Sequence, residues 1–358
     1  MSSVLRQHSV PREGKVLAAK SAPTRIEFLA GTGPNRVHFA DGSTAAASCL
    51  RCHDAPCHHY GVGESECSSL PNLPADRNAD VCPTGAVSIA ARTGAAKIDP
   101  ERCIYCGVCV ARCPVGAIFL LPSKGAVVED EANAHFATTT QYSEQAMLAS
   151  RNSLERVGKT GVFLRENDAL IADIGRRIAS VRASLTDNFP NHLARNLLRA
   201  AGISVDMRRV GNNHLRADLV LGSNGIKQGV VEVEFGVEAI LDAPRDLLDD
   251  IAVFVSRHGW KKDDIVALIV GDVLPNRRSE FWHIIRDIRD VLAIEIATVT
   301  VLVLMLLVWE RRSLPSQINK LAYADCDTAS YREAVLEKLL GRRIALALGV
   351  SAMVEVIK

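Results

Sequence analysis

Four cysteines are grouped in one short stretch of the chain. Cys103, Cys106, Cys109 and Cys113 follow the pattern C-x2-C-x2-C-x3-C-P, which ends at Pro114. At this spacing the first three thiolates can bind three irons of one [4Fe–4S] cube, and the fourth cysteine ligates a different cluster. The motif therefore predicts a second set of cysteine ligands elsewhere in the chain.

A second set of cysteines lies upstream, at Cys49, Cys52, Cys57 and Cys82. Its last member begins the segment Cys82-Pro83-Thr84-Gly85-Ala86, which parallels Cys113-Pro114-Val115-Gly116-Ala117. The two Cys-Pro-x-Gly-Ala segments indicate an internal repeat. The sequence therefore predicts two clusters that share one scaffold.

The two motifs together resemble the dicluster bacterial-type ferredoxins over residues 45–121. The resemblance implies a small βαββαβ-like unit and an exchange of the fourth ligand between the halves. Cluster one would then be held by Cys49, Cys52, Cys57 and Cys113. Cluster two would be held by Cys82, Cys103, Cys106 and Cys109. The first half departs from the family pattern by a wider gap before Cys57 and by the long insert between residues 58 and 81.

Alternatives remain open in the first half. The insert contains Cys67, which could replace Cys57 as a ligand or be a free thiol in a Gly/Ser/Pro-rich loop. Histidines stand nearby, at His53, His58 and His59. Structural zinc also uses Cys-x2-Cys pairs. Zinc sites do not need three cysteines in one seven-residue turn followed by Cys-Pro, so we expect iron–sulfur clusters.

The composition is that of an ordinary globular protein. The chain has 358 residues, a hydrophobic content of 48% and a net charge of +1, so no overall positive field attracts it to nucleic acid. Nine of its ten cysteines lie between Cys49 and Cys113, which argues against a disulfide framework. Thiolate ligands and the lack of a signal-peptide pattern at the N-terminus indicate the cytoplasm.

One apolar segment has to be weighed as a membrane span. Residues 296–309 carry no charge, but 14 residues are short of the ~18–20 needed to cross a bilayer. The segment is rich in Val, Thr and Leu, so we expect a buried strand at 298–308 and no membrane contact.

The pattern along the chain divides it into five parts. Residues 1–44 form an N-terminal extension with a hairpin at 24–28 and 36–39, and residues 45–121 form the cluster domain. A linker with a charge run covers residues 122–160. An α/β domain spans residues 161–312, and a helical segment spans residues 313–358.

Helices and strands alternate in the α/β domain. Helical spacing of apolar residues predicts helices over 169–184, 191–201, 241–258 and 280–292. Short apolar runs predict strands over 204–210, 217–221, 229–235, 265–270 and 298–308, with a hairpin turn at 222–225. The predicted fold class therefore combines α+β and α/β. A ferredoxin-like dicluster domain is followed by an α/β domain with a mixed sheet.

The order helix, three strands with a hairpin, helix, strand resembles the core of the PD-(D/E)xK, or restriction endonuclease-like, superfamily over residues 188–309. In that family an aspartate on one strand and acid-x-lysine on the next bind metal. Asp218 matches the first acid and Glu232 the second, whereas Glu234 stands at the lysine position. The resemblance implies a Mg²⁺- or Mn²⁺-dependent phosphodiesterase acting on DNA, with these three residues as metal ligands and catalytic residues.

The chemistry of this acidic hairpin is coherent. Alternation along a strand places Glu232 and Glu234 on one face, within reach of Asp218 on the neighbouring strand. Carboxylates about 4 Å apart repel by about 4 kcal/mol per pair at an effective dielectric near 20, and a hard divalent cation removes that conflict. The alternative is a half-exposed strand whose glutamates face solvent and need no cation.

Basic residues flank the hairpin at Arg208, Arg209, His214 and Arg216. They could contact phosphates or be solvated. Two functions therefore stay open. One is an iron–sulfur protein with a nuclease-like domain that acts on DNA in repair or defence. The other is an electron-transfer protein whose C-terminal domain docks a redox partner or the subunits of a larger complex. Convergence of Asp218, Glu232 and Glu234 in space favours the first.

Overall fold

The computed structural model describes residues 23–27, 36–39, 44–46, 49, 51–52, 54–61, 76, 78–113, 116–121, 125–128, 168–209, 215–223, 226–275, 278–309, 312–314, 318 and 339. The expectations for His53, Cys67 and His214, and for most of the linker and the C-terminal segment, concern residues outside these ranges. Cys326, the tenth cysteine of the chain, also lies outside them. Within the described residues, none of the helices combines the length and the apolar character that a membrane span requires.

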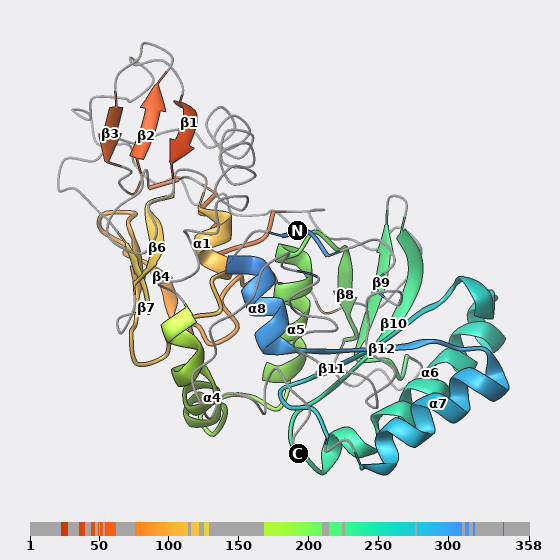
Figure 1. The fold of residues 1–358 in the computed structure, drawn as a ribbon. Coiled ribbons are helices and arrows are strands. Elements are labelled where there is room, and N and C mark those ends of the chain that lie inside the picture. The colour runs from red at the N-terminus through yellow and green to blue at the C-terminus, as the bar shows by residue number, and fades with distance from the viewer. Residues whose placement is uncertain are drawn as a thin grey trace.

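The first described elements form a small antiparallel sheet of order β1-β2-β3. Strand β1 covers Pro23–Glu27, β2 covers Arg36–Phe39 and β3 covers Thr44–Ala46. The first two strands are the expected hairpin, with Glu27 opposite Arg36. In Figure 1 this sheet lies beside the cysteine-rich part of the chain.

The cysteine-rich part contains two short antiparallel pairs and one short helix. Strand β4 (Val87–Ile89) pairs with β5 (Ala96–Ile98), α1 covers Val108–Arg112, and β6 (Ile118–Leu121) pairs with β7 (Gly125–Val128). The described order is β4-β5-α1-β6-β7, so the βαββαβ order expected from the sequence does not appear within these residues. Strand β7 belongs to this part, although its residues were assigned to the linker.

The second part is built on a five-stranded sheet of order β12-β11-β10-β9-β8. The strands cover Val205–Met207 (β8), Leu219–Ser223 (β9), Ile226–Glu234 (β10), Val266–Gly271 (β11) and Ile296–Thr300 (β12). Strands β8, β9 and β10 pair antiparallel, whereas β10, β11 and β12 run parallel. The expected mixed sheet is therefore present.

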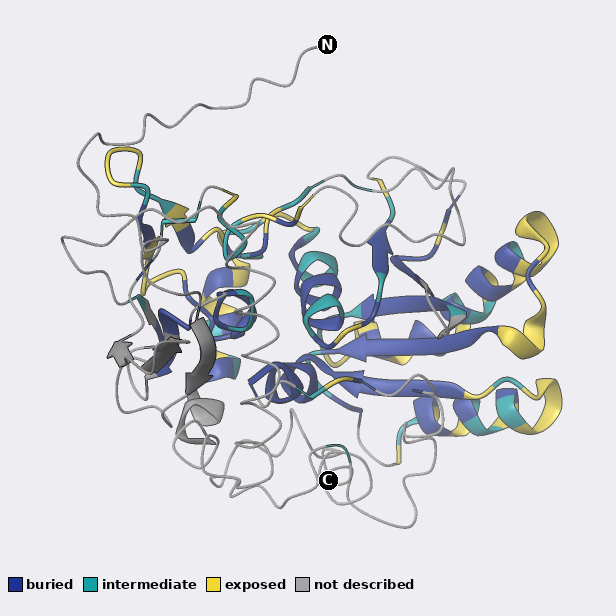
Figure 2. Ribbon diagram, turned by 90° about the horizontal axis from the view of Figure 1, so that it is seen from above, coloured by how far each residue is buried: buried dark blue, intermediate teal, exposed yellow. Residues whose placement is uncertain are grey.

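Helices cover this sheet and connect its strands. They span Asp168–Arg182 (α4), Phe189–Ala200 (α5), Ala243–His258 (α6), Glu280–Leu292 (α7) and Val301–Trp309 (α8), with short 3-10 turns at Ala239–Leu241 (η2) and Lys262–Asp264 (η3). Helix α7 begins where the Ser279 hydroxyl accepts the N–H of Phe281 and ends at Ala293 in the left-handed conformation. Figure 2 shows the strands buried along their length and the far ends of the helices exposed.

The apolar run at residues 296–309 is not one strand. It is strand β12 up to Thr300 and helix α8 from Val301 onward. The Thr300 hydroxyl accepts the N–H of Val303 at 3.3 Å, as a helix N-cap does. The prediction of a single strand was therefore wrong. Every residue of the run is buried, so the sequence has no alternation of polar and apolar residues from which the helical period could be recognised.

Helices α5 and α8 lie between the sheet and the cysteine-rich part (Figure 1). Helix α1 contacts both of them. Asn196 of α5, which is fully buried, donates to the carbonyl oxygens of Asp80 and Val81 at 3.0 Å. Neighbouring Arg195 donates to the carbonyl of Asn78 at 2.9 Å. The segment that leads into Cys82 is therefore held by the second part of the chain.

Candidate iron–sulfur centres and acidic site

The eight described cysteines form two groups. In the first group, Cys49, Cys52, Cys57 and Cys113 line one cavity, and burial followed by the other three thiols raises the pKa of Cys52. In the second, burial followed by the thiols of Cys82 and Cys103 raises the pKa of Cys106. The structure therefore brings together Cys49, Cys52, Cys57 and Cys113, and beside them Cys82, Cys103, Cys106 and Cys109. The ferredoxin resemblance implies the same grouping, and the assignment of these eight cysteines as cluster ligands stays a prediction.

Burial shapes the chemistry of both groups. Burial, and next the Cys113 and Cys49 thiols, raise the pKa of Cys57 to about 12. Burial also raises the pKa of Cys109 well above the usual range, with Cys106 and Cys103 adding to the effect. Without metal these thiols stay protonated at neutral pH. Bound iron would replace the protons and supply the positive charge that four closely spaced thiolates need.

A cavity opens among the thiols of the first group. It is lined by Cys49, Cys52, Cys57 and Cys113 together with Arg51, Ala55, Pro56, Ile89, Gly94, Ala96, Ala117 and Ile118. Thiols that converge on an otherwise mostly apolar cavity fit a [4Fe–4S] cube, which is held by four cysteines and shielded from water. Ile118 is one of the apolar residues of this lining, and Ile98 is partly buried against the core. The side chain of Phe119 lies outside the described residues.

The backbone repeats itself at the two Cys-x2-Cys turns. Arg51 and Tyr105 each precede the second cysteine of a pair, and both adopt positive φ, at 51° and 63°. A residue with a side chain in this region costs roughly 1–3 kcal/mol and persists where the surroundings over-determine it. The strain recurs at equivalent positions, as expected if each turn is shaped to bind metal.

The two Cys-Pro turns also match each other. Gly85 and Gly116 have φ of 63° and 68°, a conformation that glycine adopts without strain. Three residues earlier in each turn stands the cysteine, and the next residue donates its N–H to that cysteine's sulfur. The bonds run from Ala86 to Cys82 Sγ at 3.1 Å and from Ala117 to Cys113 Sγ at 3.2 Å.

One difference separates the two turns. The hydroxyl of Thr84, which is 1% exposed, lies 3.4 Å from Cys82 Sγ. The corresponding residue of the other turn is Val115, which has no hydroxyl. An iron-bound thiolate can only accept, so the Thr84 hydroxyl would donate to Cys82. The Cys82 turn therefore offers a side-chain hydroxyl to its sulfur, whereas the sequence of the Cys113 turn has valine at that position.

Comparison with known proteins assigns the character of this region. Residues 96–119 match the family described as "4Fe-4S binding domain". This part of the chain is a ferredoxin-like iron–sulfur segment.

Three relatives illustrate the similarity. An uncharacterized ferredoxin of Methanocaldococcus jannaschii is 32% identical over 88 residues, which are 25% of this chain and 42% of that protein. The polyferredoxin-like subunit of an aliphatic sulfonate oxidoreductase of Pyrococcus furiosus is 33% identical over 88 residues, 24% of this chain and 38% of the relative. The electron transport protein HydN of Escherichia coli is 34% identical over 85 residues, 23% and 35% respectively.

The chain thus spans about two fifths of the length of these curated relatives. No solved structure matches the chain significantly. Nothing in these matches supports the nuclease domain expected from the sequence.

The acidic hairpin lies in the second part of the chain. Asp218 immediately precedes β9. Leu219 of β9 pairs with Val231 of the antiparallel strand β10, so the preceding residue, Asp218, lies opposite Glu232. Its two oxygens accept from the Asn191 side chain at 2.8 Å and from the N–H of Val233 at 3.1 Å. Asp218 is 8% exposed. The aspartate is therefore held rigidly and largely out of water.

A further carboxylate completes the group. Asp250 of α6 is 3% exposed and shares a hydrogen bond with Glu232, which is 8% exposed. Two carboxyl groups can share a hydrogen bond only if one of them is protonated. Burial, followed by the charges of Asp218 and Asp250, raises the pKa of Glu232 to about 10. Burial raises the pKa of Asp250 to about 6.

Glu234 lies at the more open edge of this group. It is only half-buried, and burial followed by the charges of Asp218 and Asp246 raises its pKa. The structure therefore brings Asp218, Glu232 and Glu234 together on one side of β10, as the hairpin pattern predicts. Sequence reasoning missed Asp250 and Asn191. The sequence does contain one indication of Asp250: it is an aspartate at a position where the helical spacing of α6 otherwise places apolar, buried residues.

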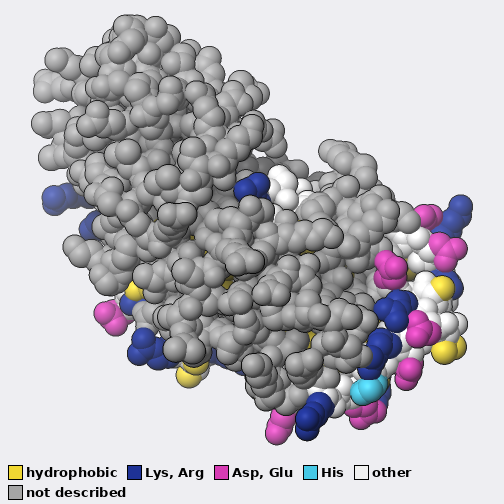
Figure 3. Space-filling view, viewed as in Figure 1, with side chains coloured by type: hydrophobic (Ala, Val, Ile, Leu, Met, Phe, Trp, Pro, Cys, Tyr) yellow, Lys and Arg dark blue, Asp and Glu magenta, His cyan; other side chains and the backbone are white. Residues whose placement is uncertain are grey.

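The basic residues near the hairpin turn toward the acidic group. Arg208 donates to the carbonyl of Arg216 at 2.9 Å and lies 3.7 Å from Asp218. Arg216 approaches Asp249 at 3.6 Å and Asp250 at 3.9 Å. In Figure 3 acidic and basic side chains are interspersed where α6 and α7 lie, so the described residues on that face form no single-sign patch.

Proposed function

We propose that this chain is an electron-transfer protein that binds two [4Fe–4S] clusters. The observation that carries the proposal is the pairing of thiols across the internal repeat, because each group of three is completed by the cysteine of the other half's Cys-Pro turn. The ligands of cluster one are Cys49, Cys52, Cys57 and Cys113. The ligands of cluster two are Cys82, Cys103, Cys106 and Cys109.

The protein's own residues have three tasks at these sites. When bound, each cluster supplies one-electron redox chemistry. The thiolates bind iron, and the apolar residues Ile89 and Ile118 exclude water from cluster one. The N–H groups of Ala86 and Ala117 donate to ligand sulfurs and stabilise the negative charge on them. These donors raise the reduction potential, since the reduced cluster is the more negative state.

The partner of such a chain would be another redox protein. The relatives include a subunit of an oxidoreductase and an electron transport protein, which supports a redox or multi-subunit partner for this chain as well. The second part of the chain would then hold the clusters and dock that partner. Its helices α5 and α8 already pack on the cysteine-rich part.

Iron content and spectroscopy test the proposal. Anaerobically purified protein should contain about eight irons per chain, and reduction should produce electron paramagnetic resonance signals of two cubes. Cys106→Ser should remove cluster two, and Cys326→Ser, outside both motifs, should change neither. Tightly bound zinc in place of iron would refute the proposal. If Cys67→Ser loses a cluster and Cys57→Ser has no effect, then Cys67, and not Cys57, is the ligand.

A second candidate function is favoured by the buried acidic group. We propose that Asp218, Glu232 and Glu234, together with Asp250, bind Mg²⁺ or Mn²⁺ for phosphodiester hydrolysis, with DNA as the substrate class. Carboxylates are the preferred ligands of these cations. When bound, the ion activates water and stabilises the leaving oxygen. Glu234, the most exposed of the set, is placed to accept the proton of the attacking water.

Two observations place this candidate second. Both oxygens of Asp218 already accept N–H groups, from Asn191 and Val233, and Glu232 is neutralised by a proton that it shares with Asp250. These partners and this proton reduce the negative charge that a cation would have to neutralise, although Asp250 Oδ2 is buried with no hydrogen-bond partner among the described residues. In addition, Glu234 stands where the lysine of the family pattern would be.

Cation binding separates a metal site from a proton-sharing carboxyl pair. Mn²⁺ at micromolar to millimolar concentration should bind the wild type, and Asp250→Asn should weaken binding. Asp249→Asn is the matched control, because Asp249 is the exposed neighbour on the same helix. Asp218→Ala should abolish Mn²⁺-dependent cleavage of DNA. If Mn²⁺ does not bind, or if Asp218→Ala leaves cleavage unchanged, the acidic group is structural.

A further inference from the structure

A two-stranded bridge connects the two cluster sites. Residues 58–60 pair antiparallel with residues 79–81, with His59 opposite Asp80. The N–H of Tyr60 donates to Ala79 at 2.8 Å, and the N–H of Val81 donates to His58 at 2.9 Å. Cys57 of the first group directly precedes one strand of the bridge, and Cys82 of the second group ends the other.

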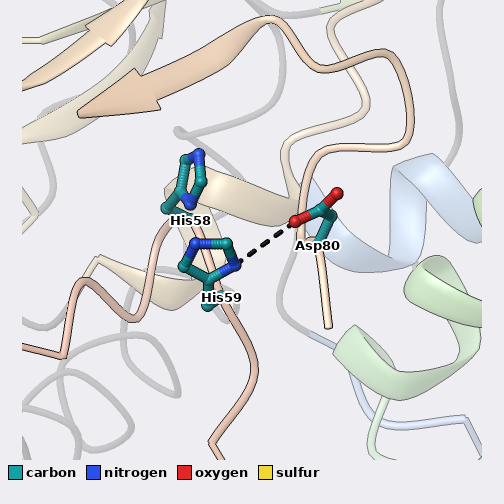
Figure 4. A group of neighbouring side chains, drawn as sticks. All are labelled: His58, His59 and Asp80. Atoms are coloured by element: carbon teal, nitrogen blue, oxygen red, sulfur yellow. Dashed lines mark ion pairs between the residues drawn. The ribbon is translucent and has the colours of Figure 1, made fainter. Parts of the chain in front are cut away.

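Three side chains with metal-ligating atoms project from this bridge. One ligand atom each of His58, His59 and Asp80 can be chosen so that all three lie within 4.8 Å of one another. His59 Nδ1 is 3.3 Å from Asp80 Oδ1, and the two imidazole rings meet edge to face at 3.9 Å between centroids. Figure 4 shows His59 directed toward Asp80 and His58 beside it.

One ring nitrogen of His58 is left without a hydrogen bond in the described part of the chain. Nδ1 of His58 is buried and has no hydrogen-bond partner among the described residues. A buried ring nitrogen without a partner costs free energy, roughly 1–3 kcal/mol, unless something else satisfies it. A metal ion bound by the neighbouring His59 and Asp80 would accept its lone pair.

We propose that His58, His59 and Asp80 bind a divalent transition-metal ion of the zinc type, separate from both clusters. Two imidazoles and one carboxylate suit Zn²⁺, whereas Mg²⁺ and Ca²⁺ prefer an all-oxygen set. With bonds of about 2.0–2.1 Å, two ligand atoms of a tetrahedral zinc lie about 3.3 Å apart. His59 Nδ1 and Asp80 Oδ1 already stand at 3.3 Å. The fourth position would be filled by water.

The backbone around the three ligands is held in place from both sides. Asn196 donates to the Asp80 carbonyl at 3.0 Å, and the Asp80 N–H donates to Asn78 Oδ1 at 2.7 Å. On the other strand, Arg112 donates to the carbonyl of Pro56 at 2.7 Å and to that of His59 at 3.4 Å. A preorganised backbone lowers the entropic cost of gathering the ligands. The ion would fix the strand leading from Cys57 against the strand leading to Cys82.

Metal content and X-ray absorption test the site on the intact iron-loaded protein. Anaerobic protein is incubated with Zn²⁺, desalted and analysed for zinc and iron. We expect one zinc per chain, an unchanged iron content, and a zinc K-edge spectrum of nitrogen and oxygen ligands at about 2.0–2.1 Å. His59→Ala and Asp80→Asn should lose the zinc and keep the iron. His283→Ala is the control, because His283 is an exposed histidine of α7.

Several outcomes would overturn the proposal. Sulfur ligands at about 2.3 Å with a matching loss of iron would mean that zinc displaces iron from the cysteines. Zinc retained by both variants, or no zinc in the wild type, would leave His59 and Asp80 as an ordinary ion pair. Because iron is measured in the same sample, the zinc result stands even if the wild type holds fewer than two cubes.

Discussion

The indole N–H of Trp309 donates a hydrogen bond of 2.9 Å to the carbonyl oxygen of Tyr105, across 204 positions of sequence. Tyr105 is the strained residue between Cys103 and Cys106, so the last residue of α8 holds the turn that carries three of the ligands proposed for cluster two. Arg177 of α4 stacks on the Tyr105 ring at 4.1 Å and donates to the carbonyl of Cys103 at 3.1 Å. Parts of the chain far beyond the motif thus determine its shape.

Gly107→Ala should destabilise this turn strongly. Gly107 has φ of 78°, and an added Cβ would lie 2.6 Å from Cδ1 of Trp309. Backbone strain and overpacking together should lower the free energy of unfolding by about 2–4 kcal/mol and reduce the iron content of cluster two. Gly259→Ala is the matched control, since φ there is 69° and no atom lies within 4 Å of the added Cβ. Stability is measured by thermal or denaturant unfolding. If Gly107→Ala and Gly259→Ala lose equal stability, the contact with Trp309 contributes nothing beyond backbone strain.

Thr84→Val should lower the reduction potential of one cluster. The hydroxyl can donate to Cys82 Sγ, and this bond is stronger to the more negative, reduced cluster. A bond stronger by about 1 kcal/mol corresponds to a shift of roughly 40 mV for one electron. Thr84→Ser keeps the donor and should retain the wild-type potential. Protein-film voltammetry that finds both clusters unchanged in Thr84→Val would exclude this role.

Glu232→Gln should stabilise the cation-free protein at neutral and alkaline pH. Burial, then Asp218 and Asp250, raise the pKa of Glu232 from 4.5 in the unfolded chain to about 10 in the folded one. The folded state therefore holds a proton that the unfolded state releases, and stability falls as pH rises from about 4.5 toward 10. The loss reaches about 3 kcal/mol at pH 7, because each pH unit above 4.5 costs about 1.4 kcal/mol.

The measurement is thermal unfolding with a chelator between pH 5 and 9. The wild type should lose stability across this range, and Glu232→Gln should lose less, because Gln needs no proton. Added Mn²⁺ should raise the stability of the wild type at high pH if the acidic group binds a cation. A parallel decline of both proteins would mean that Glu232 titrates normally in the folded state.

Asn196→Ala should release the segment that leads into Cys82. The side-chain amide satisfies the carbonyls of Asp80 and Val81, and Asn196 is fully buried. Two buried acceptors left without a donor should cost about 2–4 kcal/mol of unfolding free energy. Iron content and thermal unfolding measure the effect, with Asn188→Ala as control because the Asn188 side chain makes no capping bond. Full iron loading and unchanged unfolding in Asn196→Ala would contradict a positioning role.

The motifs and most helices of this protein follow from local sequence. The spacing of Cys103, Cys106 and Cys109 requires only one tight turn, so three ligands of a cluster are visible without a fold. Helix α7 was predicted at its observed bounds, Glu280–Leu292, because its apolar residues recur at helical spacing. Strand β10 was visible from the alternation of valine and glutamate.

Only the tertiary structure decided which residues, distant in sequence, contact these elements. Helix α8 was hidden because a fully buried run has no polar face from which a period can be recognised. Asp250 joins Glu232 only because α6 crosses β10, and a single aspartate in a helix does not reveal which strand it will face. Asn196 reaches the carbonyls before Cys82 across 115 positions, and no local pattern encodes such a contact. Local propensity acts over a few residues, whereas these contacts depend on how the helices pack between the two parts of the chain.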